Sequence, residues 1–111
     1  MSEPHYAELD MFEADLKAAV IKIAKRERWL VHHTANRQGS RNSAKGSGVP
    51  DLIMAHPGGR LILAELKKQK AKLEPLQEQW QFALERCPGI EYYVWRPSDL
   101  PDIDRILGGT Q

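Results

Sequence analysis

Three charged residues, Asp51, Glu65 and Lys67, stand at the ends of two short apolar runs and could share one chemical task. The runs, DLIMA at 51–55 and RLILAEL at 60–66, are separated by HPGG, a pattern typical of a β-hairpin. Side chains alternate along a strand, so Glu65 and Lys67 point to the same face of the second run. A carboxylate and an amine together at the end of an apolar strand indicate a site.

The hairpin turn decides how close the two carboxylates come. If the loop is 57–59, His56 pairs with Arg60 and Asp51 lies opposite Glu65, whereas a two-residue turn shifts the pairing by one position. Either register brings Asp51 and Glu65 to the same end of the hairpin. Two carboxylates at close range repel each other unless a proton or a cation lies between them, so the pair predicts a site for a hard metal ion.

The chemistry expected of such a site is hydrolysis of a phosphodiester. Oxygen ligands from Asp51 and Glu65, completed by water, a backbone carbonyl and a substrate phosphate, suit Mg²⁺ or Mn²⁺. Such an ion lowers the pKa of a bound water and neutralises charge on phosphate oxygens. Lys67 beside it could orient or deprotonate the attacking water and offset charge in the transition state.

The hairpin must be held by the elements around it, which the hydrophobic pattern predicts. Expected are a helix at 8–28, a strand at 29–34, the hairpin, a helix at 73–87, a strand at 90–95 and a short helix at 99–107 with a Ser98 or Asp99 cap. The step from the second hairpin strand through a helix to the last strand favours parallel pairing. With 111 residues the chain fits one α/β domain, 1–111, whose four-stranded mixed sheet is flanked by helices.

The two longer helices bring further polar residues toward the hairpin. Glu13 falls within the apolar arc of the first helix, although a glutamate at the edge of that arc, with its carboxylate in water, is the simpler interpretation. Gln77, in the first turn of the second long helix, can reach the same region. The apolar stripes of these helices are Leu9, Phe12, Leu16 and Val20 in the first, and Leu76, Trp80, Ala83 and Leu84 in the second.

Composition indicates where the protein is located but says little about what it binds. The net charge of +1 says little about partners, but two segments, 35–48 and 67–72, are locally basic and could bind polyanions or simply be solvated. The single cysteine, Cys87, excludes an internal disulfide, and no apolar run is long enough to span a bilayer. The acidic N-terminus is unlike a secretory signal, so we expect a cytoplasmic protein with no membrane contact.

The arrangement resembles the PD-(D/E)xK nuclease signature, with Pro50-Asp51, thirteen intervening residues and Glu65-Leu66-Lys67. The predicted order of helix, three strands, helix and strand is the order this superfamily uses, which implies a restriction-endonuclease-like core. More specific are three segments: Gly46-Ser47-Gly48-Val49-Pro50-Asp51, Pro75-x-Gln77-x-x-Trp80 and Val94-x-Arg96-Pro97-x-Asp99. Together with Glu13, they make nearly the whole chain similar to a stand-alone VRR-NUC domain, the small form found in phages and bacteria.

This resemblance implies a DNA endonuclease, structure-directed or nonspecific, that uses Mg²⁺ or Mn²⁺ and often forms a homodimer. Duplex, flapped and branched DNA, including the four-way Holliday junction, are all open as substrates. By motif position, the metal ligands are Asp51 and Glu65, the catalytic lysine is Lys67, the acid of the first helix is Glu13 and the supporting amide is Gln77. Gln77 is preferred to Gln79 because it stands three residues before Trp80. The expected DNA-binding residues are Arg37, Arg41, Lys45 and Lys68.

Simpler interpretations compete with these. Asp51 could be a turn residue after a proline, and Lys67 a solvated strand end. His32 and His33 are adjacent on a strand and face opposite ways, so they cannot chelate one ion together. Core packing suits the tryptophans better than base stacking: Trp29, Trp80 and Trp95. Two alternative functions are open: a noncatalytic nucleic-acid-binding module, and a subunit whose role is dimeric assembly.

Overall fold

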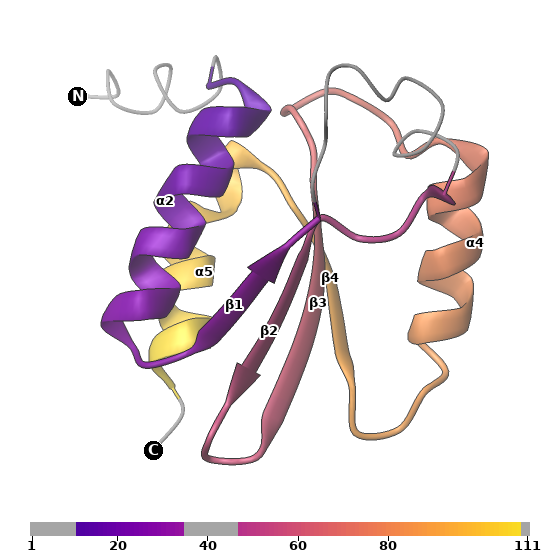
Figure 1. The fold of residues 1–111 in the computed structure, drawn as a ribbon. Coiled ribbons are helices and arrows are strands. Elements are labelled where there is room, and N and C mark those ends of the chain that lie inside the picture. Colours follow the sequence, from indigo (N-terminus) through magenta and orange to yellow (C-terminus); the bar gives the residue numbers. More distant parts are fainter. Residues whose placement is uncertain (1–10, 35–46, 110–111) are drawn as a thin grey trace.

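The computed structural model describes residues 11–34 and 47–109. Its elements, in chain order, are α2 (Glu13–Arg26), β1 (Leu30–His33), β2 (Leu52–His56), β3 (Arg60–Leu66), α4 (Pro75–Leu84), β4 (Glu91–Trp95), the 3-10 turn η1 (Pro97–Asp99) and α5 (Leu100–Gly108) (Figure 1). The predicted α/β class and element order are confirmed, and each strand lies within one residue of its expected bounds. Within the described ranges, no helix is long and apolar enough to cross a membrane.

The four strands form one mixed sheet in the order β1-β2-β3-β4. β1, β2 and β3 are antiparallel neighbours, and β3 pairs with β4 in parallel, as the crossover through α4 predicts. In the hairpin His56 pairs with Arg60, so the three-residue loop is the one adopted. Gly59 in that loop has φ 103°, a conformation that glycine reaches without strain.

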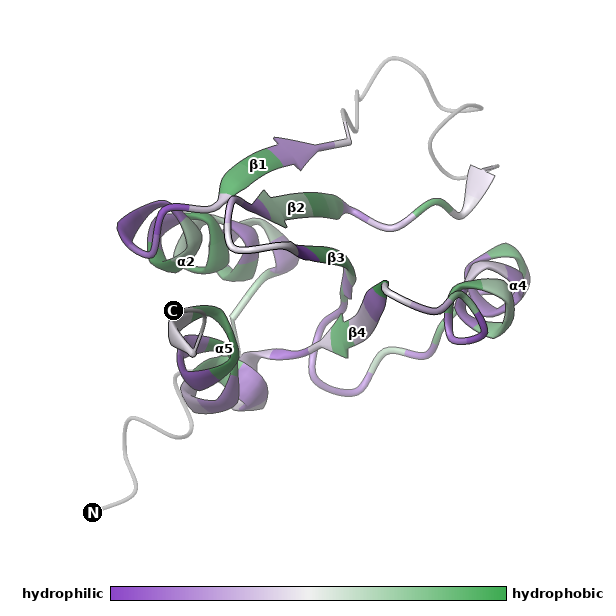
Figure 2. Cartoon of the chain, turned by 90° about the horizontal axis from the view of Figure 1, so that it is seen from below, coloured by the Kyte–Doolittle hydropathy of each residue, from purple (hydrophilic) through white to green (hydrophobic). Residues whose placement is uncertain are grey.

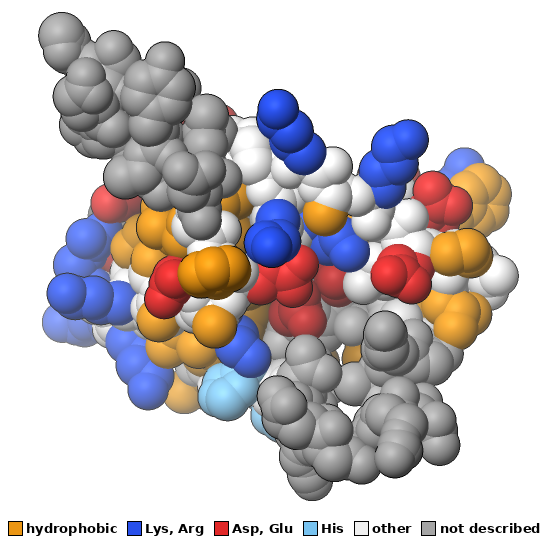
Figure 3. Space-filling view, turned by 90° about the horizontal axis from the view of Figure 1, so that it is seen from above, with side chains coloured by type: hydrophobic (Ala, Val, Ile, Leu, Met, Phe, Trp, Pro, Cys, Tyr) orange, Lys and Arg blue, Asp and Glu red, His pale blue; other side chains and the backbone are white. Residues whose placement is uncertain are grey.

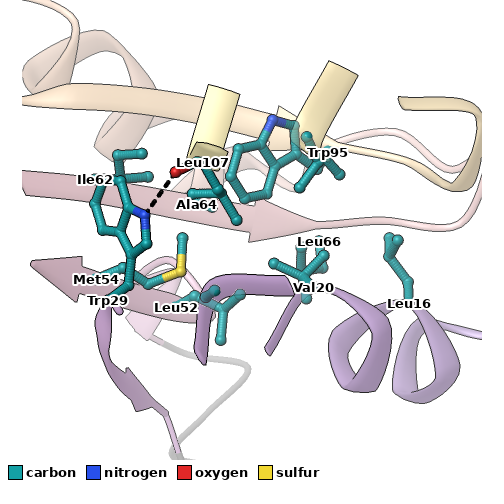
Figure 4. Close-up of a cluster of buried hydrophobic side chains, with 12 residues drawn as sticks. Leu16, Val20, Trp29, Leu52, Met54, Ile62, Ala64, Leu66, Trp95 and Leu107 are labelled. Carbon is teal, nitrogen blue, oxygen red and sulfur yellow. Dashed lines mark hydrogen bonds between the residues drawn. The ribbon is translucent and has the colours of Figure 1, made fainter. Parts of the chain in front are cut away.

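The hydrophobic core lies on the face of the sheet that α2 and α5 cover, whereas α4 stands on the other face (Figures 1 and 2). Alternation along the strands explains this, since Ile62, Ala64 and Leu66 of β3 all point to the α2 side and are buried. The Trp29 indole closes the far end of the core by donating to the Leu107 carbonyl at 3.0 Å (Figure 4). The core residues are Leu16, Val20, Ala24, Trp29, Leu52, Met54, Ile62, Ala64, Leu66, Trp95, Ile103 and Leu107.

Two expected apolar stripes differ from the structure. α2 begins at Glu13, so Phe12 is its N-cap residue with extended backbone and is 64% exposed rather than packed on the core. In α4 only Leu84 is buried, because this helix contacts the sheet mainly at β4 instead of lying across its face. Of the tryptophans, Trp29 and Trp95 are buried as expected, but Trp80 is 37% exposed.

The parallel pair β3 and β4 brings two loops to the same edge of the sheet. Both strands end there, and the Lys67 N–H donates to the Trp95 carbonyl at 3.0 Å just beyond their last paired residues. The segment leading to α4 and the turn η1 therefore leave the sheet side by side. The N-terminus of α2 lies at this edge too, which gathers four chain segments around the end of the hairpin (Figure 1).

Candidate active site

The two carboxylates lie opposite each other at the end of the hairpin remote from its turn. Leu52 pairs with Ala64, which places Asp51 and Glu65 at the next register position. The Leu66 N–H donates to Asp51 Oδ2 at 2.8 Å. Glu65 is 3% exposed, and its buried Oε1 receives no hydrogen bond from a described residue, so only a proton shared with the Asp51 carboxylate can satisfy it within the protein. A buried carboxylate oxygen without a donor is costly, so this position favours a positively charged ligand.

Gln77 ties Glu65 to Lys67. Its Nε2 donates to Glu65 Oε2 at 2.7 Å, and its Oε1 accepts from Lys67 Nζ at 3.2 Å. The same Oε1 accepts the backbone N–H of Glu74 at 2.8 Å, which completes the capping box of α4. Lys67 is itself 8% exposed. The amide thus orients a carboxylate and an ammonium, and the start of α4 fixes the amide.

Burial and mutual repulsion make the two carboxyl groups hold protons strongly. Burial raises the pKa of Glu65 to about 8, and the negative charge of Asp51 adds to this shift. Burial also raises the pKa of Asp51, against the opposing effect of the Leu66 N–H. A bound cation would lower the pKa of both carboxyl groups, because its positive charge offsets the cost of burying them and their mutual repulsion.

The donor set indicates which kind of ion would fit. The described part of the chain has no group of three or more His, Cys, Asp or Glu side chains placed to hold a metal. Asp51 and Glu65 therefore suit an ion that keeps several water ligands, as Mg²⁺ does, better than zinc, which takes three or four protein ligands. Unpartnered Glu65 Oε1 is the observation that supports this fit.

A cleft of 260 Å³ opens between α2 and the end of the hairpin and is lined by Glu13, Ala14, Lys17, Asp51 and Leu66. Acidic side chains gather at the centre of this face, with basic side chains beside them (Figure 3). Glu13, the first residue of α2, lines the cleft and is exposed, in agreement with the simpler interpretation of a carboxylate in water. Sequence reasoning missed Lys17, which is half-buried and whose charge opposes the effect of burial on the pKa of Asp51. Its position four residues after Glu13 on one helix face was the available signal.

The chain entering β2 holds the start of α4 in place. The Trp80 indole N–H donates to the Ser47 carbonyl at 2.8 Å. Gly48 has φ +69°, and a Cβ at this position would lie 2.6 Å from the Leu76 carbonyl carbon and 2.9 Å from the Gln77 nitrogen. The glycine-rich segment and the Pro-x-Gln-x-x-Trp segment are therefore two halves of one contact.

The other residues considered from the sequence do not line the cleft or lie outside the described residues. Lys68 is exposed, with Nζ 5.3 Å from the centre of the Phe12 ring. His56 is the last residue of β2 rather than part of the turn, and its Nδ1 accepts the Gly58 N–H from the turn at 2.9 Å. Gln79 is exposed, and so are both histidines of β1. Outside the described residues lie Arg37, Arg41 and Lys45.

Comparison with known proteins agrees with this arrangement. The sequence pattern of the VRR-NUC domain matches residues 8–99. The chain belongs to the VRR-NUC family. VRR-NUC domains are nuclease domains, and the family implies DNA as partner and a divalent metal. No curated protein matches the chain.

The fold is also similar to that of a solved structure described as a VRR_NUC domain. The TM-score is 0.66 and the sequence identity 20%, over 84% of this chain and 94% of the other. At this identity the likeness concerns the fold alone, and it agrees with the α-β-β-β-α-β order described above. The function must therefore be argued from the site.

Proposed function

We propose that this VRR-NUC domain is a Mg²⁺- or Mn²⁺-dependent endonuclease that hydrolyses phosphodiester bonds in DNA. The observation that carries the proposal is the buried, unpartnered Oε1 of Glu65 opposite Asp51, with Lys67 held beside the pair through Gln77. Two carboxylates, a lysine and an orienting amide form a set suited to charge that grows on phosphate oxygens.

Asp51 and Glu65 would hold the ion, which when bound polarises water and offsets negative charge on the phosphate. Lys67 would place its ammonium beside the scissile phosphate, where it orients the attacking water and neutralises charge on the non-bridging oxygens. Hydrolysis forms a bond between the water oxygen and phosphorus, breaks the ester bond to the departing sugar oxygen, and leaves that oxygen protonated. Through its two hydrogen bonds, Gln77 would hold the Lys67 ammonium and the Glu65 carboxylate at a fixed distance from each other during the reaction.

Glu13 and Lys17 would act from the α2 side of the cleft. Glu13 adds a third carboxylate near the ion, for example through a water molecule, and Lys17 offers a positive charge to a phosphate that enters the cleft. Neither side chain lies in the Gln77 network, so we expect them to affect substrate and ion affinity more than the geometry of Lys67.

Substrate choice and assembly are the finer parts of the proposal. We infer a structure-directed enzyme that prefers flapped, branched or four-way-junction DNA and works as a homodimer, which rests on the family resemblance. Phosphate contacts would come from the exposed Lys68, which directly follows Lys67 in the chain, and from Arg37, Arg41 and Lys45 in the segment that precedes β2.

The test is cleavage of labelled linear, flapped and four-way-branched DNA with Mg²⁺, Mn²⁺ or a chelator. Lys67→Ala should abolish metal-dependent cutting, whereas Lys22→Ala, which removes an exposed lysine of α2, should not. The ranking of substrates then gives the structural preference. Binding without cutting under every metal would refute the nuclease and favour a noncatalytic DNA-binding module.

A further inference from the structure

The segment 68–72, which we call the lysine strap, connects β3 to α4 and begins next to Lys67. Its residues alternate in exposure: Lys68, Lys70 and Lys72 are exposed, whereas Gln69 and Ala71 are half-buried. The strap thus presents lysines outward at every second position. A solvated loop would show no such alternation, because nothing would hold its intervening residues inward.

Both inward residues of the strap are attached to the loop after β4. Gln69 Nε2 donates to Ser98 Oγ at 2.9 Å, and Gln69 Oε1 accepts the Ser98 N–H at 3.0 Å. Arg96 Nη2 donates to the Ala71 carbonyl at 2.6 Å. Within the strap, the Ala71 N–H donates to the Lys68 carbonyl at 3.2 Å, which closes a turn. The strap is therefore fixed at two successive inward positions.

The support under the strap is itself rigid. Asp99 Oδ2 accepts the Arg96 N–H at 2.8 Å, and the Asp99 N–H donates back to the Arg96 carbonyl at 2.8 Å. Pro97 between them is buried. Because β3 and β4 are parallel and end at the same edge, this closed loop and the strap are held together next to the candidate active site.

The described residues provide no ion pair for the lysines of the strap. The Lys68 ammonium lies 5.3 Å from the centre of the Phe12 ring, which carries no charge. Ordering a loop costs conformational entropy, and holding three like charges outward adds repulsion. An arrangement of this kind favours a polyanion as partner, since each phosphate would relieve that repulsion.

We propose that the lysine strap is a surface that binds the DNA phosphate backbone next to the scissile phosphate, held in position by Ser98 and Arg96. The inference rests on the proposed nuclease function. Phosphate contacts of this kind are independent of base sequence and fix the register and orientation of the nucleic acid. The strap would therefore align the backbone with Lys67, which directly precedes it in the chain.

The first test measures binding of a short fluorescent DNA duplex in the presence of a chelator, across a range of salt concentrations. Lys70→Ala/Lys72→Ala should lower the slope of log affinity against log salt by about two, one for each lysine. The matched control, Lys22→Ala/Lys25→Ala, removes two exposed lysines of α2 and should leave the slope unchanged. A strap variant with the wild-type slope would overturn the proposal.

The second test separates fixed position from mere charge. Gln69→Ala keeps every lysine but loses both hydrogen bonds to Ser98, so we expect DNA cleavage to slow about fivefold. Ser98→Thr, which keeps the hydroxyl and the N–H, should retain wild-type cleavage. Circular dichroism shows whether each variant is folded. Wild-type cleavage by a folded Gln69→Ala protein would overturn the role of the Ser98 anchor.

The two proposals fail in different ways. If the wild-type protein binds DNA but cuts no substrate with any metal, the nuclease assignment fails, and the salt slope still tests the strap. If the wild-type protein cuts DNA but the strap variant keeps the wild-type slope, the strap proposal fails alone.

Discussion

Replacing Glu65 by glutamine should stabilise the metal-free protein while it removes nuclease activity. Glutamine keeps an oxygen for the Gln77 amide and places an N–H₂ group where the unpartnered Oε1 now lies. That amide can donate to Asp51, which stands opposite in the hairpin register. The change therefore removes a buried negative charge without creating a cavity.

The magnitude follows from the pKa of Glu65, which burial and then the charge of Asp51 raise from 4.5 to about 8. In the folded protein the carboxyl keeps a proton that the unfolded chain has lost, so stability is full below pH 4.5 and falls as the pH rises toward 8. At about 1.4 kcal/mol for each pKa unit, the shift from 4.5 to about 8 sets an upper limit of about 5 kcal/mol on this loss. Local relaxation and water penetration reduce this, and we expect about 2 kcal/mol, or roughly 8 °C in Tm.

The measurement is thermal unfolding of wild-type and Glu65→Gln protein in chelator at pH 8 and at pH 4.5. The variant should melt higher at pH 8 and equally at pH 4.5, where the wild-type carboxyl is protonated. Adding Mn²⁺ should raise the Tm of the wild-type protein alone. Glu78→Gln, which removes an exposed charge from α4, is the matched control and should not shift the melting temperature. A variant that melts at or below the wild-type temperature at pH 8 would refute the reasoning.

Three further changes probe the support of the site, each with circular dichroism to verify folding. Gln77→Ala should lower kcat by roughly tenfold to a hundredfold, because Lys67 and Glu65 lose their common partner, whereas Gln79→Ala should leave cleavage unchanged. Gly48→Ala should cost about 2 kcal/mol in urea unfolding, since its φ is positive and a methyl group meets the backbone of α4; wild-type stability would contradict the contact. Lys17→Ala should lower kcat/KM roughly tenfold if the cleft receives a phosphate, while Lys22→Ala should not. Equal effects of the two variants would mean that Lys17 acts only through the overall positive charge of α2 and does not contact the phosphate.

The sequence was sufficient to predict the hairpin and its carboxylate pair because both depend on local rules. Side-chain alternation put Glu65 and Lys67 on one face, and the Pro-Gly-Gly loop set Asp51 opposite Glu65. The turn limits the register to two choices, so the predicted proximity hardly depends on the rest of the fold. Placing Gln77 at the same site needed the family motif, because its contacts cross from a helix to a strand.

The failed predictions concern elements whose partners are distant in sequence. Helical periodicity assigned Phe12 to the core, but periodicity does not show where a helix begins, and α2 begins one residue later. The stripe of α4 is a real amphipathic pattern, yet it does not reveal that the helix contacts β4 and Ser47 rather than a whole sheet face. Lys17 was missed because its spacing of four residues from Glu13 is also common on solvated helix faces, and only the opposite wall of the cleft shows that this lysine lines a site.

Contacts outside the chemistry explain why the recognisable motif is longer than its reactive residues. Gly48 and Trp80 set the position of the first turns of α4, and with it the amide of Gln77. Since that amide holds both Glu65 and Lys67, a small shift of the helix would displace two charged groups at once, and displacements of this size are costly in catalysis. The short signature of two acids and a lysine arises readily by chance. The packing of Gly48 on the start of α4, together with the hydrogen bond from Trp80 to the Ser47 carbonyl, does not. The longer segments are therefore specific because they are needed to place the reactive groups.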